Sequence, residues 1–382
     1  MSRGNRTVHV LMLQWLAHGH VSPFLQLGKR LSERNFHSYS CSTPVNLTSI
    51  KPKISEKYSS FIELAYRPRL MSTLKAAFDK GSPCFSDIIK NLSPDLVAYD
   101  SHQPWALEIA RLQNVPAVTF WSVSAGMASF FFHAVKNVGE EFPFEAIRFM
   151  ITSNGTSTEL EGKYMDYLSS LVGKRVISVG PLVQDPRQDD GNDEILKWLD
   201  QKEERSSVFK EGEEIAYGLE LSNVNFIWLI RFPVGESMEL EEALPTGFLE
   251  RVGDRGLVRE GWEPQTKILE HPSIGGFVSH CGWSSIMESM KSGVPIAMPM
   301  QLNQPLNARI VEEVGVKLEV MRDKSGVLER KEIEKVIKRV VVQKDGESVR
   351  KKAKEMSDSI RNEGERELDE MVDALVDVLN EG

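Results

Sequence analysis

The chain has few cysteines and no long apolar run. Its 382 residues include only three cysteines, Cys41, Cys84 and Cys281, which lie far apart in the sequence. Such a set is too sparse for a disulfide framework or a cysteine-rich zinc site, and it is typical of a reducing compartment. No apolar stretch approaches the roughly 20 residues that a membrane-spanning helix requires. We therefore expect a cytoplasmic protein without a membrane span.

Basic residues are also in deficit. The chain has 46 Lys and Arg residues against 55 Asp and Glu residues, a formal net charge of -9. Because proteins bind nucleic acid through a basic surface, we expect no nucleic-acid partner. Hydrophobic residues make up 41% of the chain and charged residues 26%, which excludes a disordered or fibrous protein. The length predicts two globular domains.

Short apolar segments alternate with helical patterns along the whole chain. The predicted strands are residues 8–13, 37–43, 95–99, 116–120, 175–181, 225–231, 256–261, 275–280 and 294–300. Strands that alternate with helices predict parallel βαβ units, and continuous apolar strands indicate sheets covered on both faces. The fold class is therefore predicted to be α/β, with doubly wound parallel sheets.

A polar stretch, QDPRQDDGND, is the best candidate for a domain linker because it combines Pro, Gly and four Asp residues. We place the linker at residues 183–192. The first domain is then predicted at residues 1–182 and the second at 193–360, and a C-terminal helix at 361–382 is expected to pack back on the first domain.

A histidine and an aspartate follow two predicted strands of the first domain. His20 lies shortly after strand 8–13, and Asp100 ends the segment DLVAYD. Ligands of open α/β sheets bind at the carboxyl ends of strands, where a histidine can act as general base and a carboxylate can fix its tautomer. Residue type alone does not separate His20 from His18 or from a structural loop histidine. Asp100 could equally cap a helix that begins near Pro104.

The second domain contains a strand that turns into a helix through polar and small residues. These residues, which follow the predicted strand, are His280, Cys281, Gly282, Trp283, Ser284 and Ser285. A helix N-terminus presents free backbone N–H groups and a positive dipole end, which together bind phosphate. An alternative is that Ser285 and Glu288 form a capping box that only begins the helix. The two uses can coexist.

Polar residues follow two further strands of the second domain. Trp262 follows a predicted strand and precedes Glu263 and Gln265. Its indole could stack on a planar base while Gln265 reads polar edges, although a tryptophan at a strand end is more often part of the core or the cleft wall. The segment QLNQ at residues 301–304 offers amides that suit sugar hydroxyls.

The segment WEPQTKILEHPSIGGFVSHCGWSSIMESMKSGVPIAMPMQLNQ, residues 262–304, closely resembles the signature box of plant family-1 UDP-glycosyltransferases. The segments HGHVSPF, VGPLVQD and FLERVGDRG are similar to the same family, so the resemblance covers nearly the whole chain. It is strongest to members that add a sugar to an existing glycoside of a triterpenoid, a flavonoid or a carotenoid-derived acceptor. The resemblance implies a GT-B fold, with two Rossmann-like domains facing a cleft.

The resemblance also implies an inverting transfer of glucose from UDP-glucose to a small lipophilic glycoside, with no metal and no further cofactor. His20 would deprotonate the acceptor hydroxyl, and Asp100 would orient His20. The other candidate positions would hold the donor. They are Trp262, Glu263 and Gln265 for the uracil, Glu288 for the ribose, His280, Gly282, Ser284 and Ser285 for the diphosphate, and Trp283, Asn303, Gln304 and Ser122 for the sugar.

The chain departs from the family pattern in two ways. Glu263 stands where the family usually has Ala, Ser284 where it has Asn, and Asn303 where it has Asp or Glu. The chain is also shorter than the family pattern near residues 67, 151 and 208. The shortfall near residue 208 is expected to remove the first strand of the second domain. The alternative function is therefore a UDP-binding pseudoenzyme, or a truncated inactive form that lacks this strand.

Overall fold

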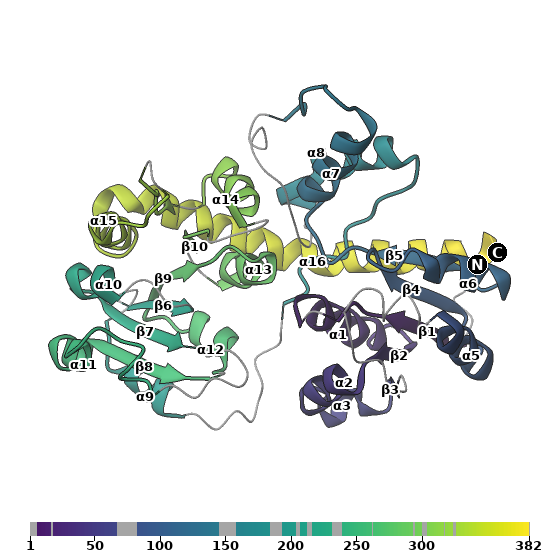
Figure 1. The fold of residues 1–382 in the computed structure, drawn as a ribbon, viewed down its shortest axis with the longest axis horizontal. Helices are drawn as coiled ribbons and strands as arrows, with labels where there is room; N and C mark the ends of the chain where they lie inside the picture. The colour runs from purple at the N-terminus through teal and green to yellow at the C-terminus, as the bar shows by residue number, and fades with distance from the viewer. Residues whose placement is uncertain are drawn as a thin grey trace. The chain divides into compact units, whose positions relative to one another are not determined.

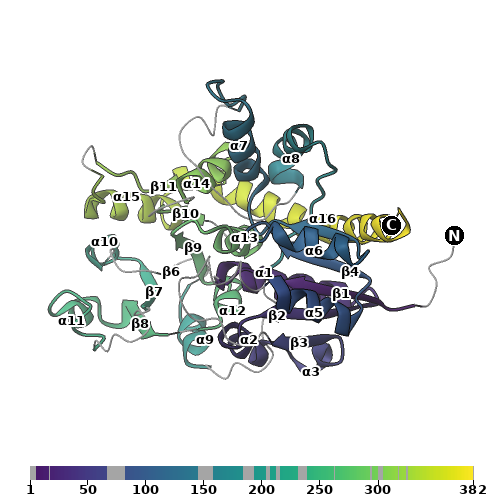
Figure 2. The same ribbon diagram turned by 45° about the vertical axis from the view of Figure 1, so that its right-hand side comes forward.

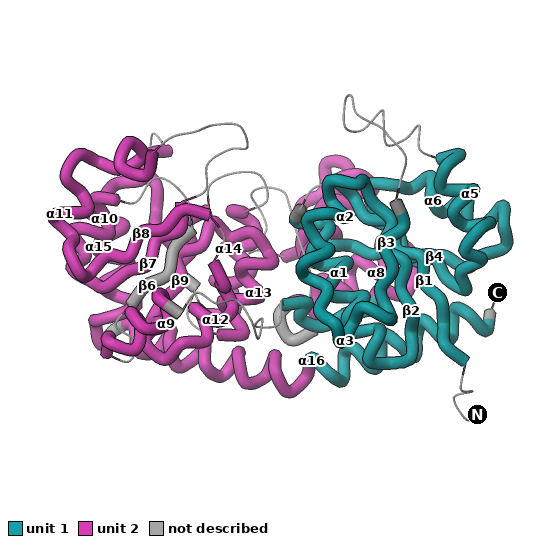
Figure 3. The backbone as a smooth tube through the Cα atoms, turned by 90° about the horizontal axis from the view of Figure 1, so that it is seen from below, with its two compact units in different colours: residues 1–122, 177–183, 364–382 teal, residues 123–176, 184–363 magenta. Residues whose placement is uncertain are grey.

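The structure is a computed structural model that describes residues 6–16, 18–66, 82–144, 158–183, 193–203, 207–211, 216–230, 239–261, 263–292, 295–299, 304–316, 318–323 and 326–381. The chain folds into two compact units (Figure 3). Unit 1 comprises Met1–Ser122, Ile177–Val183 and Gly364–Gly382, and unit 2 comprises Val123–Val176 and Gln184–Glu363. The predicted domains, 1–182 and 193–360, differ from these units at residues 123–176, and their borders remain a proposal.

Unit 1 contains a five-stranded parallel sheet. Its strands are β1 (Val8–Leu13), β2 (Phe36–Ser42), β3 (Ile62–Tyr66), β4 (Leu96–Asp100) and β5 (Ala117–Phe120). Their order is β3-β2-β1-β4-β5, so the chain reverses its direction of winding between β1 and β4. In open α/β sheets this switch point is where ligands bind, outside the carboxyl ends of the two strands.

The sheet of unit 1 is buried on both faces because its strands carry apolar residues at successive positions. Val10 and Met12 of β1 pack with α1 (His18–Ser32) and α16 (Glu347–Glu381). Leu11 and Leu13 point to the opposite face, where they pack with α5 (Ser82–Leu92) and α6 (Trp105–Leu112) (Figure 1). The first strand is apolar along its length because helices bury both of its faces, as predicted for a doubly wound sheet.

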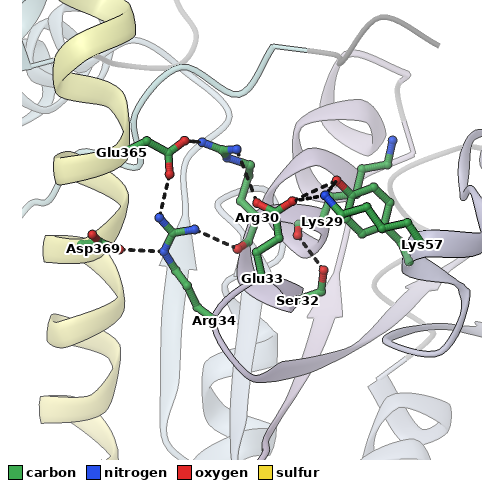
Figure 4. Close-up of polar contacts among 9 residues, drawn as sticks. Lys29, Arg30, Ser32, Glu33, Arg34, Lys57, Glu365 and Asp369 are labelled. Carbon is green, nitrogen blue, oxygen red and sulfur yellow. Dashed lines mark hydrogen bonds and ion pairs between the residues drawn. The ribbon is translucent and has the colours of Figure 1, made fainter. Parts of the chain in front are cut away.

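The C-terminal helix α16 is held to α1 by ion pairs as well as by apolar packing (Figure 4). Arg34 Nη2 lies 2.9 Å from Glu365 Oε2, and Arg34 Nε lies 2.8 Å from Asp369 Oδ1. Arg30 also pairs with Glu365. One guanidinium thus bridges two carboxylates one turn apart on α16, a geometry that is more rigid than a single exposed pair.

We expect Arg34→Ala to lower the free energy of unfolding by about 1 kcal/mol, since each exposed ion pair contributes roughly 0.2–1 kcal/mol. The melting temperature should fall by about 1–2 °C in a thermal scan, because the unfolding entropy scales with chain length. Arg309→Ala is the matched control, because Arg309 pairs only with Glu312 one helical turn away among the described ion pairs. An Arg34→Ala melting temperature equal to that of the control would mean that these pairs contribute little to the docking of α16.

Unit 2 contains a six-stranded sheet in which β6 is central. Its strands are β6 (Ser207–Glu211), β7 (Asn225–Ile230), β8 (Gly256–Glu260), β9 (Ile274–Ser279), β10 (Pro295–Ala297) and β11 (Leu318–Glu319), in the order β11-β10-β9-β6-β7-β8. The expectation that the first strand of this half is missing is therefore wrong. Five residues suffice, because β6 pairs in parallel with both β7 and β9.

Helices also cover both faces of the sheet in unit 2. Phe277 of β9 packs with α9 (Asp193–Asp200) and α12 (Gln265–Leu269). The preceding residue, Gly276, faces the other way and lies close to Val340 of α15 (Arg330–Val341). The remaining helices of this unit are α7 (Ala125–Lys136), α8 (Thr158–Val172), α10 (Ala216–Ser222), α11 (Phe248–Val252), α13 (Trp283–Ser292) and α14 (Gln304–Glu313).

Helices α7 and α8 lie side by side (Figures 1 and 2). The buried Glu161 of α8 accepts the backbone N–H groups of Ala125 and Gly126, at 3.1 and 2.8 Å. It thereby satisfies donors of the first turn of α7 that have no partner within that helix. Short helical segments complete the described fold: α2 (Pro44–Ile50), η1 (Lys51–Lys53), α3 (Glu56–Ser59), η3 (Gly253–Arg255) and η4 (Lys344–Gly346).

The segment 175–181 was predicted to be a strand but forms none, although all of its residues are described. It lies against α16: Ser178 Oγ is 3.1 Å from Glu367 Oε2 and also accepts the backbone N–H of Gly180. Side-chain and packing contacts with a helix thus replace the expected strand pairing. Among the described helices, none combines the length and the apolar character that crossing a membrane would require.

Candidate functional site

Two of the predicted site residues meet at the switch point of the sheet in unit 1. His20 lies in the first turn of α1, which follows β1, and Asp100 is the last residue of β4. His20 Nδ1 is 2.7 Å from Asp100 Oδ2. The structure places His20 in a helix and not in a loop, with a partner 80 residues away, while its role as the base stays a prediction. The side chain of His18, the other candidate, lies outside the described residues.

Asp100 is fully buried, and every polar contact that it makes stabilises its ionised form. The side chain is 0% exposed. Burial alone would raise the pKa of Asp100, but hydrogen bonds from His102 and His20 and the charge of His20 outweigh burial and lower this pKa to about 2. An ionised carboxylate only accepts hydrogen bonds, so His20 Nδ1 carries the hydrogen of this contact, and Nε2 is the nitrogen that can accept a proton when the imidazole is neutral. This tautomer is the one that a general base requires.

Asp100 does not cap the helix that follows it. Its Oδ1 accepts the backbone N–H of His102 at 3.0 Å, and its carbonyl oxygen accepts the backbone N–H of Gln103 at 2.9 Å. Helix α6 begins five residues after Asp100, at Trp105. The alternative interpretation as a helix cap is therefore wrong, and the carboxylate belongs to a turn that faces His20.

Ser122 contributes a third group to the same cluster. Its Oγ is 2.7 Å from His20 Nδ1 and 3.4 Å from Asp100 Oδ2, and the side chain is buried. Ser122 follows the end of β5 by two residues, at the same edge of the sheet. The structure therefore places this hydroxyl beside the histidine and the aspartate, while its predicted contact with a sugar stays a prediction.

His102 is the residue that sequence reasoning missed in this cluster. Its Nδ1 is 2.8 Å from Asp100 Oδ1, so the two carboxylate oxygens each face one imidazole. His20, Asp100 and His102 offer ligand-type atoms within 4.8 Å of one another, whereas no such set was expected from the sequence. The set was hard to recognise because 82 positions separate the two histidines in the sequence. The Asp-x-His spacing was the available signal.

In unit 2, the residues predicted to bind phosphate lie in the turn between β9 and α13 and in the first turn of α13. The backbone of Cys281 has φ of 67°, in the left-handed region that non-glycine residues rarely adopt. The turn is held by Asn307 of α14, whose Nδ2 donates to the Cys281 carbonyl at 2.9 Å. Sequence reasoning missed Asn307, although it lies three residues, one helical turn, after Gln304. Backbone strain at such a turn is typical of functional sites.

Helix α13 begins at Trp283, so Gly282 precedes its first turn and Ser284 and Ser285 lie within that turn. The interpretation of Ser285 and Glu288 as a capping box is therefore wrong in register, because Ser285 is already helical. Glu288 instead accepts a hydrogen bond from Gln265 Nε2, at the start of α12. The structure thus brings together two residues predicted for the nucleoside.

The other predicted donor residues are described in part. The side chain of Trp283 is 2% exposed, so a sugar contact by this residue would involve its backbone. Glu263 is half-buried, and its carbonyl oxygen accepts the backbone N–H of Gln265 at 2.7 Å. Gln304 is the first residue of α14. Trp262 and Asn303 lie outside the described residues.

We expect Gly282→Ala to weaken the binding of UDP-glucose. A Cβ atom at this position would lie 2.6 Å from His280 Nε2, so the imidazole would have to leave its place beside the turn. Loss of one hydrogen bond to a charged phosphate should raise the dissociation constant roughly tenfold, measured by calorimetry. Gly28→Ala is the control, since a Cβ there meets its neighbours at 3.7 Å or more. Unchanged affinity would show that His280 does not contact the diphosphate.

Comparison with known proteins supports one family. The UDP-glucoronosyl and UDP-glucosyl transferase family model matches residues 208–369. Mogroside IIIx synthase of Siraitia grosvenorii is 45% identical over 435 residues, which cover 96% of this chain and 92% of the relative. Beta-D-glucosyl crocetin beta-1,6-glucosyltransferase of Gardenia jasminoides is 42% identical over 438 residues, which cover 97% of this chain and 99% of the relative.

Both alignments are longer than the 382 residues of this chain, so the relatives contain residues that it lacks. The expected shortfalls near residues 67 and 151 lie outside the described residues. The shortfall near residue 208 leaves β6 in place.

Solved structures show the same fold. A UGT transferase from Siraitia grosvenorii in complex with UDP has a TM-score of 0.79 and 26% identity, and the match covers 97% of this chain and all of that chain. A UDP-glucosyltransferase from Polygonum tinctorium has a TM-score of 0.82 at 23% identity, covering 98% of this chain and 99% of that chain. The predicted GT-B fold is confirmed. From the identity of its relatives and the share of their length that it covers, the chain belongs to the UDP-glycosyltransferase family and is a glycosyltransferase.

Proposed function

We propose that the protein transfers glucose from UDP-glucose to a hydroxyl of a small lipophilic glycoside, with inversion at the anomeric carbon. The observation that carries this proposal is the hydrogen bond between His20 Nδ1 and the buried carboxylate of Asp100, at the switch point of the sheet. A histidine that is held in this tautomer presents a basic nitrogen where ligands of such sheets bind.

The reaction follows from these groups. His20 Nε2 accepts the proton of the acceptor hydroxyl while the acceptor oxygen attacks the anomeric carbon. The bond between that carbon and the UDP oxygen breaks, and attack from the opposite side converts an α-linked donor into a β-glycoside. Asp100 stabilises the imidazolium that forms. The N-terminal turn of α13, with Ser284, Ser285 and His280, stabilises the negative charge that develops on the departing diphosphate.

The class of acceptor is inferred from the named relatives. They include the mogroside IIIx synthase and the glucosyl crocetin glucosyltransferase, and a third, a flavanone 7-O-glucoside 2''-O-beta-L-rhamnosyltransferase of Citrus maxima, is 39% identical. The latter two names specify an acceptor that already carries a glucose. We therefore propose a triterpenoid or flavonoid glycoside as acceptor. A cytoplasmic location, and the absence of a metal, a further cofactor or a nucleic-acid partner, are parts of the same proposal.

The test is a reaction with UDP-glucose and a panel of triterpenoid and flavonoid glucosides, analysed by mass spectrometry beside the matching aglycones. The expected product is one hexose heavier than a glucoside acceptor, and its rate of formation falls by roughly 10²–10⁴-fold with His20→Ala. UDP-rhamnose and UDP-glucuronic acid replace UDP-glucose in parallel reactions to test the donor. Transfer from one of these alone would contradict glucose as the sugar. Calorimetric binding of UDP without transfer from any donor would instead favour the pseudoenzyme.

Trp262→Ala should weaken UDP binding by roughly 1–3 kcal/mol, the contribution of one base stacked on an aromatic side chain. The indole is expected to stack on the uracil, so Trp262→Phe, which keeps an aromatic ring, should retain most of the affinity. Titration calorimetry with UDP measures both variants. Equal affinities for the wild type and Trp262→Ala would contradict the predicted stacking.

A further inference from the structure

We propose that His102 is a positioning residue, which holds the carboxylate of Asp100 in place for His20. This inference deepens the proposed function and rests on it, because it assigns His20 as the base of the transfer. It concerns a side chain that the sequence did not single out and that contacts the aspartate of the site directly.

The contacts show how His102 acts on the carboxylate. Its Nδ1 lies 2.8 Å from Asp100 Oδ1, and its backbone N–H donates to the same oxygen at 3.0 Å. Asp100 Oδ2 is thereby left to His20 Nδ1, at 2.7 Å. Because a carboxylate rotates about a single bond, two donors on one oxygen determine where the other oxygen points. His102 therefore sets the direction of the hydrogen bond that orients His20.

His102 is itself held in place by two further contacts. Its ring stacks on the indole of Trp15, with centroids 5.3 Å apart and planes inclined by 22°. Gln103, the next residue, donates from its backbone N–H to the Asp100 carbonyl and from Nε2 to the carbonyl of Gln14 at 3.1 Å. The turn that carries His102 is thus tied to the end of β1, the strand that leads into the helix of His20. Because its own position is fixed in this way, His102 can fix the position of the Asp100 carboxylate.

The two imidazoles are also coupled electrostatically through the carboxylate that they share. Their ring centroids are 4.9 Å apart, with the planes nearly perpendicular. In the described part of the chain, His102 contacts the side chains of Asp100, His20 and Trp15. Ser122 contacts Asp100 and His20. A hydrogen bond from His102 draws on the negative charge of Asp100, and a protonated His102 would repel a protonated His20. Replacing His102 is therefore expected to change how readily His20 takes up a proton.

Exposure separates the proposed roles of the two histidines. The side chain of His102 is 47% exposed and that of His20 is 14% exposed. Water competes more strongly for the exposed ring, whereas the less exposed ring is held by Asp100 and Ser122 together. Because both imidazoles contact one carboxylate, the test must also include the outcome that His102 is the base.

The first experiment compares His102→Phe with His102→Asn. The phenylalanine keeps a ring for Trp15 but has no donor, so we expect kcat to fall about tenfold. The acid limb of the kcat/KM profile should move to higher pH, while the KM for UDP-glucose stays constant. The asparagine places an amide donor where Nδ1 was, and kcat should return to within about twofold of the wild type. His271→Phe is the matched control, because it removes a histidine that contacts Asp200 in unit 2.

Three results would overturn the inference. In the first, His102→Phe has the kcat and pH profile of the wild type. In the second, His102→Asn is as impaired as His102→Phe, which would indicate a role for the ring alone. In the third, His102→Phe abolishes transfer while His20→Ala retains it, which would make His102 the base.

A second measurement separates this inference from the proposed function, because it needs no acceptor. Imidazole nitrogens labelled with 15N are titrated by NMR in the full-length wild type and in His102→Phe. The titration midpoint of His20 should move to higher pH in the variant. An unchanged midpoint overturns the coupling even where transfer is observed. If the midpoint moves but no glycoside is glucosylated, the proposed acceptor class fails and the coupling stands.

Discussion

His20→Ala is expected to lower kcat for glucosyl transfer by roughly 10²–10⁴-fold, the usual contribution of a positioned general base. The variant removes the nitrogen that would accept the acceptor proton, and Asp100 cannot replace it because the carboxylate is fully buried and its pKa is about 2. The affinity for UDP should remain that of the wild type. The residues predicted to hold UDP belong to unit 2, whereas His20 belongs to unit 1.

Product formation is measured by mass spectrometry at saturating UDP-glucose, and UDP affinity by calorimetry on the same preparation. His271→Ala controls for the loss of an imidazole elsewhere, since His271 Nε2 contacts Asp200 and lies in unit 2. If His20→Ala keeps near-normal turnover, then His20 is not the base. If it loses UDP affinity together with turnover, the defect lies in folding or donor binding, and the assigned role fails this test.

Much of the fold was predictable because parallel strands buried on both faces appear as continuous apolar segments. The predicted strand 8–13 coincides with β1, and the predicted strands 225–231 and 256–261 differ from β7 and β8 by one residue at the C-terminal end. Local pattern is informative there because the sheet demands apolar residues on both faces. The carboxyl ends of the predicted strands 8–13 and 95–99 then predicted where His20 and Asp100 would lie.

The remaining errors concern features that depend on contacts with distant residues. The segment 175–181 has a strand-like composition, but Ser178 bonds to Glu367 of α16 and no strand forms. The segment 207–211 is short, yet it becomes the centre of a sheet because β7 and β9 pair with it on either side. Neither partner can be identified from the local sequence. Local propensity gave the wrong answer for 175–181, and the short length relative to the family pattern gave the wrong answer for 207–211.

The site shows the same division between local pattern and distant contacts. Position after a strand indicated His20 and Asp100, but the choice between Asp100 as a helix cap and Asp100 as a histidine partner required the 2.7 Å contact across 80 residues. His102 was overlooked because the Asp-x-His spacing, the one local signal for it, does not by itself show that both oxygens of Asp100 face an imidazole. Its proposed role follows from two contacts seen in the structure: Asp100 Oδ1 lies beside its Nδ1, and its ring stacks on Trp15.

The ionised state of Asp100 makes a prediction about pH. The pKa of this carboxyl is about 2 in the folded protein against 3.8 for the unperturbed group. Because the folded-state value is the lower one, the ionised carboxylate stabilises the fold at pH values above about 4. This contribution, about 2 kcal/mol, is lost as the pH falls from about 4 to about 2. Asp100 therefore stays ionised between pH 5 and 8, and an acid limb of the activity profile in that range is not expected to come from this carboxyl.

Asp100→Asn should lower kcat by roughly 10²–10⁴-fold while the protein stays folded at neutral pH; the comparable aspartate-to-asparagine change in a serine protease triad costs about 10⁴-fold. An amide has the shape of the carboxylate but carries two N–H donors and no charge. If its nitrogen faces His20, Nδ1 must become the acceptor, and the hydrogen moves to Nε2, where the base is needed. If its oxygen faces His20, the nitrogen meets the donors of His102, and the imidazolium loses its counter-charge.

Asp95→Asn is the control for this substitution, because Asp95 lies just before the same strand and bonds to Arg6 and to the backbone of His9. Urea unfolding of the wild type and Asp100→Asn, measured from pH 7 to pH 2.5, should give a stability difference that is constant above about pH 5 and shrinks below about pH 4. A kcat near the wild-type value would show that neither the tautomer nor the charge of Asp100 matters to His20. A stability difference that stays constant down to pH 2.5 would mean that Asp100 is not held ionised by its two histidines, and the electrostatic basis of the site would then have to be sought elsewhere.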